Sequence, residues 1–518
     1  MMFWVDFQCL RARLLPYFLV FILTLVFCIN TVSAAVIQHS GVISAQTTWS
    51  ALDVHQITQT VTVNAGVQLT IEPGAIVKFN QNTALNINGV LVAVGNVSEK
   101  IIFTSYRDDS VGGDTNGDGF SEGAAGDWSS LSYGSTVIDF LTSLDHVEVR
   151  YGGASTAAIY QNSANVAITN SVIRDSATAG IFLSSSSALI ENNDISSVAT
   201  TAIYSQHAST PQILNNRLTG GVHHGIHTSY GTTPLIDGNV ITGFDSWPIY
   251  YTDAPATASV ITNNTVTGNG YSVALPASAV PNVADNNVLL PNTNNLIYIR
   301  GNVRTTDLHL EVLREGNAEL NTYIIAGSST QQAGTTLTID PGVNLKFTNG
   351  SYLYSYGAIQ AVGTAADRIV LTSVYDDTVG AKYSSGNVNS GIWGGLTIGA
   401  GDTSANLAYM DLRYAASAID TAVDTTASNL RISQSSSHGL LTRSNAVVTL
   451  SDSEVYGGNT WGVRCYHSQR LTVTNSRIYA NGGDGFQFEG SCQGAISNTE
   501  IFGNIGYGIN NTGSQVIA

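Results

Sequence analysis

A 48-residue segment of this chain occurs twice, and this duplication restricts its possible folds more than any other feature. Residues 65–112 and 333–380 align without a gap at a constant shift of 268, and 21 of the 48 positions are identical. A run of shorter repeats follows each copy. We therefore expect two equivalent units, each made of an opening segment followed by repeats. The first is 35–301, with its opening segment at 61–151 and repeats at 155–290, and the second is 302–518, with its opening segment at 320–414 and repeats at 415–518.

The shorter repeats have a period of 21–24 residues, which is typical of a solenoid. Each places an apolar residue after a small one. Short alternating runs broken by Gly and Asn predict strands and turns. We predict an all-β fold, a parallel β-helix in which each repeat is one coil and equivalent residues lie about 4.8 Å apart. The predicted core positions are Ile159, Ile181, Ile203, Ile226, Ile249 and Val273 in the first unit, and Ile419, Leu440, Val463, Phe486 and Ile509 in the second.

A second repeated position carries Asn or Ser just before a strand. In the first unit it is occupied by Asn170, Asn193, Asn216, Asn239, Asn264 and Asn287. The repeat pattern lapses at 291–334, so we place the unit boundary near Asn302 and expect one short helix at 308–320.

The first residues predict a secretory signal peptide, residues 1–34. Arg11 and Arg13 precede an apolar run from Leu14 to Ile29, and small residues end at Ala34, where a signal peptidase would cleave. A retained membrane anchor is the alternative. After cleavage the mature chain would be secreted or displayed at the cell surface and would have no membrane span.

Signal cleavage would leave two cysteines, Cys465 and Cys492. A single disulfide fits an oxidising compartment. The two residues lie 27 apart where the local repeat is 23, so they are out of phase by four residues. Sequence spacing therefore leaves the bridge open.

The charge balance limits the possible ligands. The net charge is -17, with only 20 Lys and Arg residues, which argues against a nucleic-acid partner because phosphates require a basic face. Neutral glycans, cations or proteins fit better. The alternative is that the acidic excess only keeps an exported protein soluble.

Four segments carry a resemblance to a known family. The first unit opens with EPGAIVKF, LVAVG, FTSYRDDSVGGDTNGDG and GDW, and with them the chain resembles the right-handed parallel β-helix, pectin-lyase-like repeat proteins that bacteria export or display. The resemblance covers nearly the whole mature chain and implies a right-handed coil. The family includes polysaccharide lyases, hydrolases, epimerases and surface proteins without known activity, so the resemblance leaves function open.

The opening segment of the first unit contains a candidate calcium loop. Oxygen-bearing residues alternate from Asp114, and Gly119 is the sixth residue, which matches the first half of a calcium-binding loop. The second unit keeps the Asp376-Asp377 pair but lacks the loop, so we expect one structural calcium ion. The predicted ligands are Asp114, Asn116, Asp118, Phe120 and Glu122, with Asp108, Asp109 or Asp127 able to complete the shell. A solvated turn is the alternative.

The paired aspartates at 108–109 and 376–377 could act as general acid and base. A polygalacturonase-like site would also require NTD, GHG and RIK motifs, which the chain lacks. A pectate-lyase-like site would require an Arg or Lys base. The only basic residues in 157–290 are Arg174, Arg217 and four His. We therefore assign the pairs to turn capping and predict no catalytic residue. We also expect no shared metal at His223-His224 and His227, because His224 and His227 should face differently on a strand.

A column of rings follows the inward-facing core positions of the first unit. Alternation places these rings on the outer face, where five coils would span about 19 Å, the length of a few sugar units. Stabilisation of the sheet by ring stacking is the alternative. The column comprises Tyr160, Phe182, Tyr204, His227 and Tyr250.

A second set of mostly aromatic residues lies two residues before the core positions and could form a ledge at a turn. The first unit has His224, Trp247 and Tyr271 there, and the second has His438, Trp461, Asp484 and Tyr507.

Three functions follow from these features. The leading hypothesis is an exported, non-enzymatic recognition protein that binds a polysaccharide or cell-surface glycan. The alternatives are a polysaccharide lyase, hydrolase or epimerase, and a purely structural surface spacer.

Overall fold

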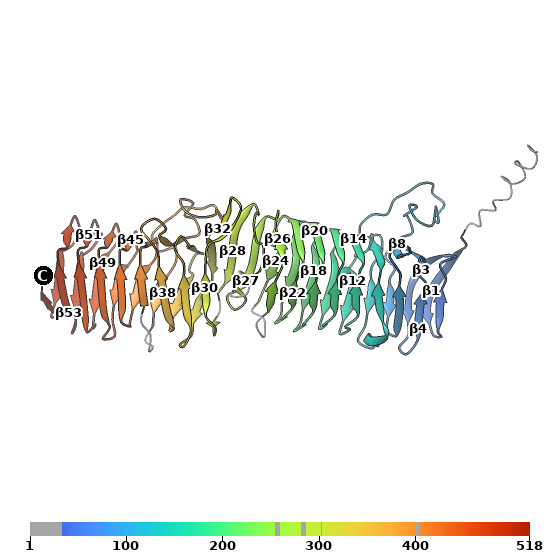
Figure 1. Ribbon diagram of the computed structural model, residues 1–518, viewed down its shortest axis with the longest axis horizontal. Helices are drawn as coiled ribbons and strands as arrows, with labels where there is room; N and C mark the ends of the chain where they lie inside the picture. The colour runs from blue at the N-terminus through green and yellow to red at the C-terminus, as the bar shows by residue number, and fades with distance from the viewer. Residues whose placement is uncertain (1–33, 254–258, 281–285, 302, 400–404, 518) are drawn as a thin grey trace, which may run out of the picture.

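The computed structural model describes residues 34–253, 259–280, 286–301, 303–399 and 405–517, which form an elongated parallel β-solenoid (Figure 1). The predicted all-β solenoid is therefore confirmed. The predicted signal peptide lies almost entirely in residues 1–33, outside the described residues. In the part that the structure describes, no helix has both the length and the hydropathy needed to cross a membrane.

Most coils contribute three strands, so three sheets run along the first unit. The first sheet contains β1 (Val36–Ile43), β3 (Val54–Val63), β5 (Ile76–Phe79), β8 (Ile101–Ser105), β11 (Val147–Arg150), β14 (Val172–Ser176), β17 (Asp194–Val198), β20 (Arg217–Gly221), β23 (Val240–Phe244) and β26 (Thr265–Val266). The second contains the end of β3 and then β6 (Leu85–Ile87), β9 (Leu131–Tyr133), β12 (Ala157–Asn162), β15 (Ala179–Ser184), β18 (Thr201–Gln206), β21 (His224–Thr228), β24 (Ile249–Tyr251) and β27 (Tyr271–Pro276). The third runs from β2 (Thr47–Trp49) to β25 (Val260–Thr262).

The second unit is offset from the first by one sheet. By sequence, β33 (Thr322–Ala326) and β36 (Asn344–Phe347) correspond to β3 and β5, in the first sheet. In the structure, β28 (Asn294–Arg300) pairs with β27 and then with β33. The first sheet of the second unit therefore continues the second sheet of the first unit. Equivalent surfaces of the two units consequently face different directions around the solenoid axis.

We call the second sheet of the first unit, β28 and the first sheet of the second unit together the continuous sheet. Beyond β36 it contains β39 (Ile369–Ser373), β42 (Met410–Arg413), β45 (Arg431–Ser433), β48 (Glu454–Tyr456), β51 (Arg477–Tyr479) and β54 (Glu500–Phe502). The two other sheets of the second unit run from β29 (Val303–Arg304) to β55 (Ile509–Thr512), and from β30 (Leu308–Leu310) to β56 (Gln515–Ile517).

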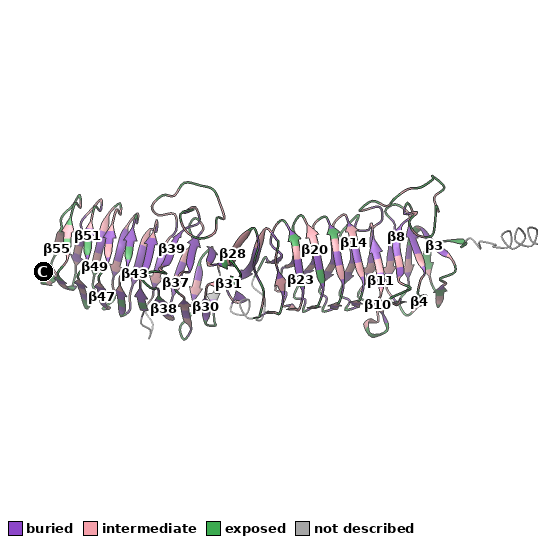
Figure 2. Ribbon diagram, turned by 45° about the horizontal axis from the view of Figure 1, so that its top comes forward, coloured by how far each residue is buried: buried purple, intermediate pink, exposed green. Residues whose placement is uncertain are grey.

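The predicted core positions are buried in the interior of the solenoid, except Ile509, which is half-buried. In the first unit Ile159, Ile181, Ile203, Ile226 and Ile249 are adjacent in register and fully buried. One apolar core extends from the first unit through the junction into the second, as the buried strands in Figure 2 show. The boundary placed near Asn302 thus falls where the core is continuous, and residue 302 itself is outside the described residues.

Buried asparagines link successive coils at one turn. The side-chain amide of Asn193 donates to Asn216 Oδ1 at 3.0 Å, and Asn216 and Asn239 repeat the bond to the next coil. Asn170 is out of register with the other residues predicted at this repeated position, because the neighbouring Ser171 is the equivalent of Asn193 and donates its backbone N–H to Asn193 Oδ1. Asn170 instead has a φ of 51° at the turn, a conformation that Asn tolerates better than most residues.

The predicted helix at 308–320 is also wrong. The segment forms β30 and an antiparallel hairpin of β31 (Leu313–Glu315) and β32 (Ala318–Leu320). Stacking on a neighbouring coil satisfies the backbone of β30, and such tertiary pairing overrides a weak helical propensity.

A disulfide joins two coils of the second unit. Cys465 in β49 (Trp461–Tyr466) and Cys492, just before β53 (Gln493–Ser497), are fully buried, and their Cα atoms lie 6.1 Å apart. The bridge therefore forms although the two cysteines are out of phase in the repeat.

Candidate functional site

The predicted ring column forms a continuous stack on the outer face of the second sheet. We call Tyr160, Phe182, Tyr204, His227 and Tyr250 the aromatic strip. Each pairs in register with the next, and successive ring centroids lie 5.4, 4.7, 4.5 and 4.9 Å apart. Each ring is half-buried, so part of each faces solvent.

The stacking decides which parts of the rings are available. Phe182 and Tyr204 are nearly parallel, with an interplanar angle of 2°, and His227 lies at 15° to Tyr204. Their faces are therefore occupied by one another, and the strip presents ring edges and hydroxyls. At the N-terminal end the neighbour of Tyr160 is Ser132, which leaves one face of the Tyr160 ring without an aromatic neighbour in the column.

Uncharged residues flank the strip on both sides. On one side lie Asn162, Ser184 and Gln206, which are adjacent in register. Tyr204 Oη donates to Gln206 Oε1 at 3.3 Å and lies 3.0 Å from Ser229 Oγ. On the other side small residues such as Ala179 take the equivalent position. The surface thus combines aromatic edges with neutral hydrogen-bonding groups.

His227 of the strip and the neighbouring His224 are both neutral at physiological pH. Burial, with the charges of His224 and Arg300, lowers the pKa of His227 to about 4, and burial likewise lowers the pKa of His224 to about 4. The expectation that they face differently is wrong. Both lie on the outer side, with ring centroids 5.2 Å apart, because Gly225 and Ile226 are both buried between them. Neither belongs to a cluster of potential metal ligands among the described residues.

The C-terminal end of the strip meets a second group of rings. Ala274 follows Tyr250 in the column, and Tyr298 follows Ala274. We call Trp247, Tyr271, Tyr298 and Tyr383 the junction cluster. Trp247 stacks on Tyr271 at 4.3 Å, and Tyr383 lies 5.5–6.4 Å from the other three rings.

Tyr383 comes from a long loop of the second unit. We call the segments between β8 and β9 and between β39 and β40 (Gly395–Ile398) the first and second insertion loops, residues 106–130 and 374–394. Because Tyr383 lies in the second insertion loop, a segment of the second unit covers the end of a surface of the first.

Arg300 lies between the strip and the junction cluster. Its guanidinium stands over the rings of Tyr250 and Tyr298, 5.1 and 6.0 Å from their centroids, and Nη2 donates to Tyr250 Oη. Among the described residues, the buried Arg300 Nε has no hydrogen-bond partner. Sequence reasoning missed Arg300, Tyr298 and Tyr383 because all three lie outside the repeat pattern.

Trp461 belongs to a different surface. It stacks on His438 at 5.1 Å, and Arg464 stands 5.1 Å from its centroid. Both lie in the sheet that contains β49, whereas Trp247 borders the continuous sheet. The structure therefore places Trp247 beside the aromatic strip and Trp461 apart from it.

Both insertion loops are held by the same anchor. Lys78 Nζ donates to the Gly113 carbonyl at 2.6 Å, and its counterpart Lys346 donates to the Ala381 carbonyl at 2.8 Å. A Cβ at Gly112 would lie 2.9 Å from Val54, and one at Gly380 would lie 2.4 Å from Thr322. Only Gly allows the loop to approach the sheet so closely at these positive φ values.

The first aspartate of each pair caps the turn, as the sequence predicts. Asp108 accepts hydrogen bonds from Thr104 and Ser110 and pairs with Arg150 at 2.5 Å. Burial alone would raise the pKa of Asp108, but those hydrogen bonds and the Arg150 charge hold it below its usual value. Asp376 makes the equivalent contacts with Thr372, Thr378 and Arg413.

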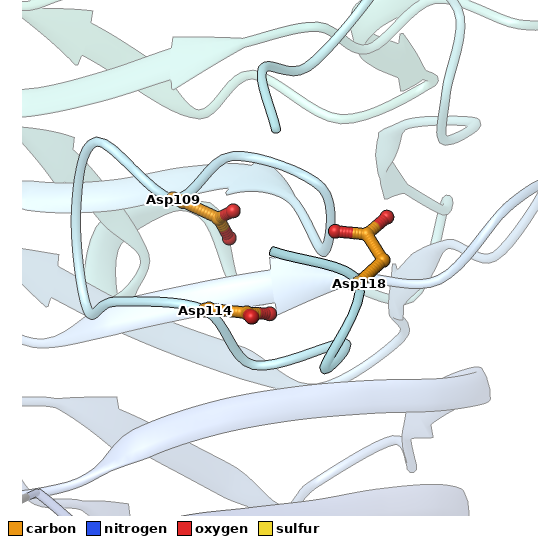
Figure 3. A group of neighbouring side chains, drawn as sticks. All are labelled: Asp109, Asp114 and Asp118. Atoms are coloured by element: carbon orange, nitrogen blue, oxygen red, sulfur yellow. The ribbon is translucent and has the colours of Figure 1, made fainter. Parts of the chain in front are cut away.

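Three carboxylates gather in the first insertion loop (Figure 3). Oxygens of Asp109, Asp114 and Asp118 lie within 4.8 Å of one another. Of the other predicted ligands, Asn116 donates from Nδ2 to Asp118 at 2.8 Å, the Phe120 side chain is 79% exposed, and Glu122 is exposed. Asp127 is occupied by Ser105 and Arg107. The loop spacing predicts Asp109 only as a residue able to complete the shell. In the structure it is one of the three carboxylates that gather.

The second insertion loop contains an ion pair in the equivalent place. At the shift of 268, Asp377 replaces Asp109 and Lys382 replaces Asp114. Lys382 Nζ lies 2.8 Å from Asp377 Oδ2. The Lys382 ammonium group therefore takes the place in the second loop that the Asp114 carboxylate has in the first.

Comparison with known proteins identifies the family. The model described as the right-handed beta helix region matches residues 156–311 and 401–517. These ranges cover more than half of the chain, which therefore belongs to this family, and the predicted handedness is confirmed.

A search of curated protein sequences found no match. Among solved structures, the chain is similar to the catalytic domain of a GH87 alpha-1,3-glucanase variant in complex with tetrasaccharides. The identity is 12%, with 94% of this chain and 70% of that chain covered and a TM-score of 0.17. A likeness at this level has no bearing on activity or substrate.

Proposed function

We propose that this protein is an exported recognition protein that binds a linear carbohydrate along the aromatic strip without catalysis. The observation that supports it is an outer face on which an aromatic ring recurs once per coil, three of the five rings with a phenol hydroxyl, flanked by the neutral Asn162, Ser184 and Gln206. Sugars expose C–H groups and hydroxyls, which such a surface contacts without charge.

The dimensions of the strip agree with an extended ligand. Four coil steps from Tyr160 to Tyr250 span about 19 Å, enough for several sugar units. Tyr160 offers an unstacked ring face at the open end, and the amide of Asn162 is exposed beside it. We expect the tightest contact there, because the inner rings offer only their edges.

We further propose that the first insertion loop binds one calcium ion through Asp109, Asp114 and Asp118, with a structural role. Three carboxylates in close proximity repel one another unless a cation neutralises them. The Lys382–Asp377 pair supports this proposal, since it supplies a positive charge at the corresponding place of the other loop.

Binding to polysaccharides tests the proposed function. The mature chain is incubated with neutral and acidic polysaccharides, with and without calcium, and both co-sedimentation and release of new chain ends are followed. We expect retention without new ends. Replacing Tyr160 and Tyr204 by Ala should reduce retention at least tenfold, whereas Tyr479→Ala, in a ring stack of the second unit, serves as the matched control.

Three outcomes would contradict the proposal. New chain ends from any substrate would show an enzyme and direct attention to the carboxylates and histidines near the strip. Equal retention by the strip variant and the control would place binding elsewhere. Absence of both retention and new ends would leave a structural spacer.

A further inference from the structure

Arg300 lies at an outer strand position against the rings of Tyr250 and Tyr298. Arg150, Arg174 and Arg413, which also lie on outer strand positions, each have a carboxylate within 4.0 Å. Among the described residues, Arg300 has no such ion pair. Its neighbours in adjacent coils are Pro276 and Ala326, which carry no charge. A guanidinium is therefore held among uncharged groups in a chain whose net charge is -17.

The groups facing this guanidinium are aromatic or neutral. Tyr250 and Tyr298 lie below it, and Tyr298 and Tyr383 are close enough to feel its charge. Burial, with the charges of His224 and Arg300, lowers the pKa of His227 to about 4, while the Asp253 carboxylate acts in the opposite direction. The acceptor that the described residues provide for the guanidinium is the Tyr250 hydroxyl. Weak hydration and ring stacking make Arg suited to such a place, but the charge itself remains unneutralised.

The position of Arg300 links it to the aromatic strip. It reaches back from β28 to Tyr250 in β24, two coils away, across the small Ala274. Beyond it, Tyr298 and Tyr383 form a wall, and the next residues of the column, Ile324 and Lys346, are fully buried. The strip is thus open beyond Tyr160 and closed at Arg300.

We propose that Arg300 binds one anionic substituent at the closed end of the aromatic strip, so that the ligand is a linear sugar chain with a negatively charged group at or near one end. The inference rests on the proposed function. Carboxylate, sulfate ester and phosphate ester share the chemistry that a guanidinium recognises, namely two acceptor oxygens in a plane. A chain of many charges is disfavoured by the acidic protein, whereas a single charge at Arg300 is compensated locally.

A matched set of sugars tests the site itself. Glucose, glucuronate, glucose 6-sulfate and glucose 6-phosphate are titrated into the mature chain, and their dissociation constants are measured by ligand-observed NMR. We expect at least one charged sugar to bind at least tenfold more tightly than glucose, and the order of the three identifies the anion. Arg300→Met should bring the charged sugars to the level of glucose, and Arg300→Lys should restore part of the preference.

Controls separate the site from bulk charge and from misfolding. Arg470→Met removes one exposed positive charge elsewhere and should leave the preference intact. The melting temperature of each variant shows whether it is folded. Equal affinity of the wild type for all four sugars would overturn the proposal, as would equal losses in the Arg300 and Arg470 variants.

The two proposals fail in different ways. Retention of neutral polysaccharides by the wild type, without any preference for charged sugars, would remove the anion site and leave the recognition function. Charged sugars that bind through Arg300 while no polysaccharide is retained would keep the site and remove the proposed function of the strip.

Discussion

The two insertion loops begin from the same anchor but are stabilised differently at their tips. Lys78 and Lys346 hold equivalent carbonyls, and Trp128 and Trp393 stack on Phe79 and Phe347 at 4.0 and 4.1 Å. Three carboxylates lie together at the tip of the first loop. At the tip of the second loop, Tyr383 packs against the three other rings of the junction cluster.

The position of each loop in the solenoid explains the difference. The second loop lies next to an earlier unit, whose Tyr298 and Trp247 provide an apolar surface. At the position that corresponds to Tyr298, the first unit has Gln38 in its outermost described strand. A loop tip beside apolar rings can be held by packing, and one without them requires polar or ionic contacts.

The largest expected effect tests whether the anchors are equivalent. Trp128→Ala and Trp393→Ala each remove a fully buried ring that also donates to the Arg150 or Arg413 carbonyl. We expect each to lower the free energy of unfolding by about 3–5 kcal/mol, measured by denaturant titration. The half-buried Trp461 should cost less on truncation. A loss in only one of the two variants would show that the anchors are not equivalent.

The second largest effect is expected from the contact between Tyr383 and the three other rings of the junction cluster. Tyr383→Ala removes a ring packed on three others, and we expect a loss of about 2 kcal/mol together with faster hydrogen exchange in residues 375–392. Thr115→Ala, the same position in the first loop, is the matched control and should cost less than about 0.5 kcal/mol. Similar exchange in the two variants would contradict packing as the difference.

Calcium should stabilise only the first loop. A tenfold excess of calcium over its dissociation constant contributes about 1.4 kcal/mol by mass action, so chelation should lower the melting temperature of the wild type. Asp114→Lys would place a cation beside Asp109, as Lys382 does beside Asp377. This variant should lose the calcium response and remain folded. A retained response would place the ion elsewhere.

The smallest expected effect concerns the ring column of the first unit. Because the pKa of His227 is about 4 in the folded state and near 6.5 in the unfolded state, the unfolded chain binds more protons between these values. Stability is thus complete above about pH 6.5 and declines as the pH falls toward 4. His227→Tyr should reduce the loss between pH 7 and pH 5.5 by about 1 kcal/mol, measured by thermal unfolding. An unchanged pH dependence would show that His227 stays hydrated.

Repetition made most of the fold predictable from sequence. A repeat that stacks on itself must place equivalent residues in columns, so the inward Ile159 to Ile249 and the outward Tyr160 to Tyr250 followed directly from the period. The segment 308–320 was misassigned because pairing with a neighbouring coil determines its conformation. The facing of His224 and His227 was misassigned because two adjacent residues, Gly225 and Ile226, are both buried between them.

The sequence by itself determined the coil, the columns and the duplicated anchors, because these depend on residues related by a constant shift. Only the tertiary structure decided that the second unit is offset by one sheet, that Tyr383 covers the end of the first unit's strip, and that Arg300 reaches Tyr250. The physical reason is that these contacts join residues from different coils at the one place where the repeat is broken, and no period relates such residues in the sequence.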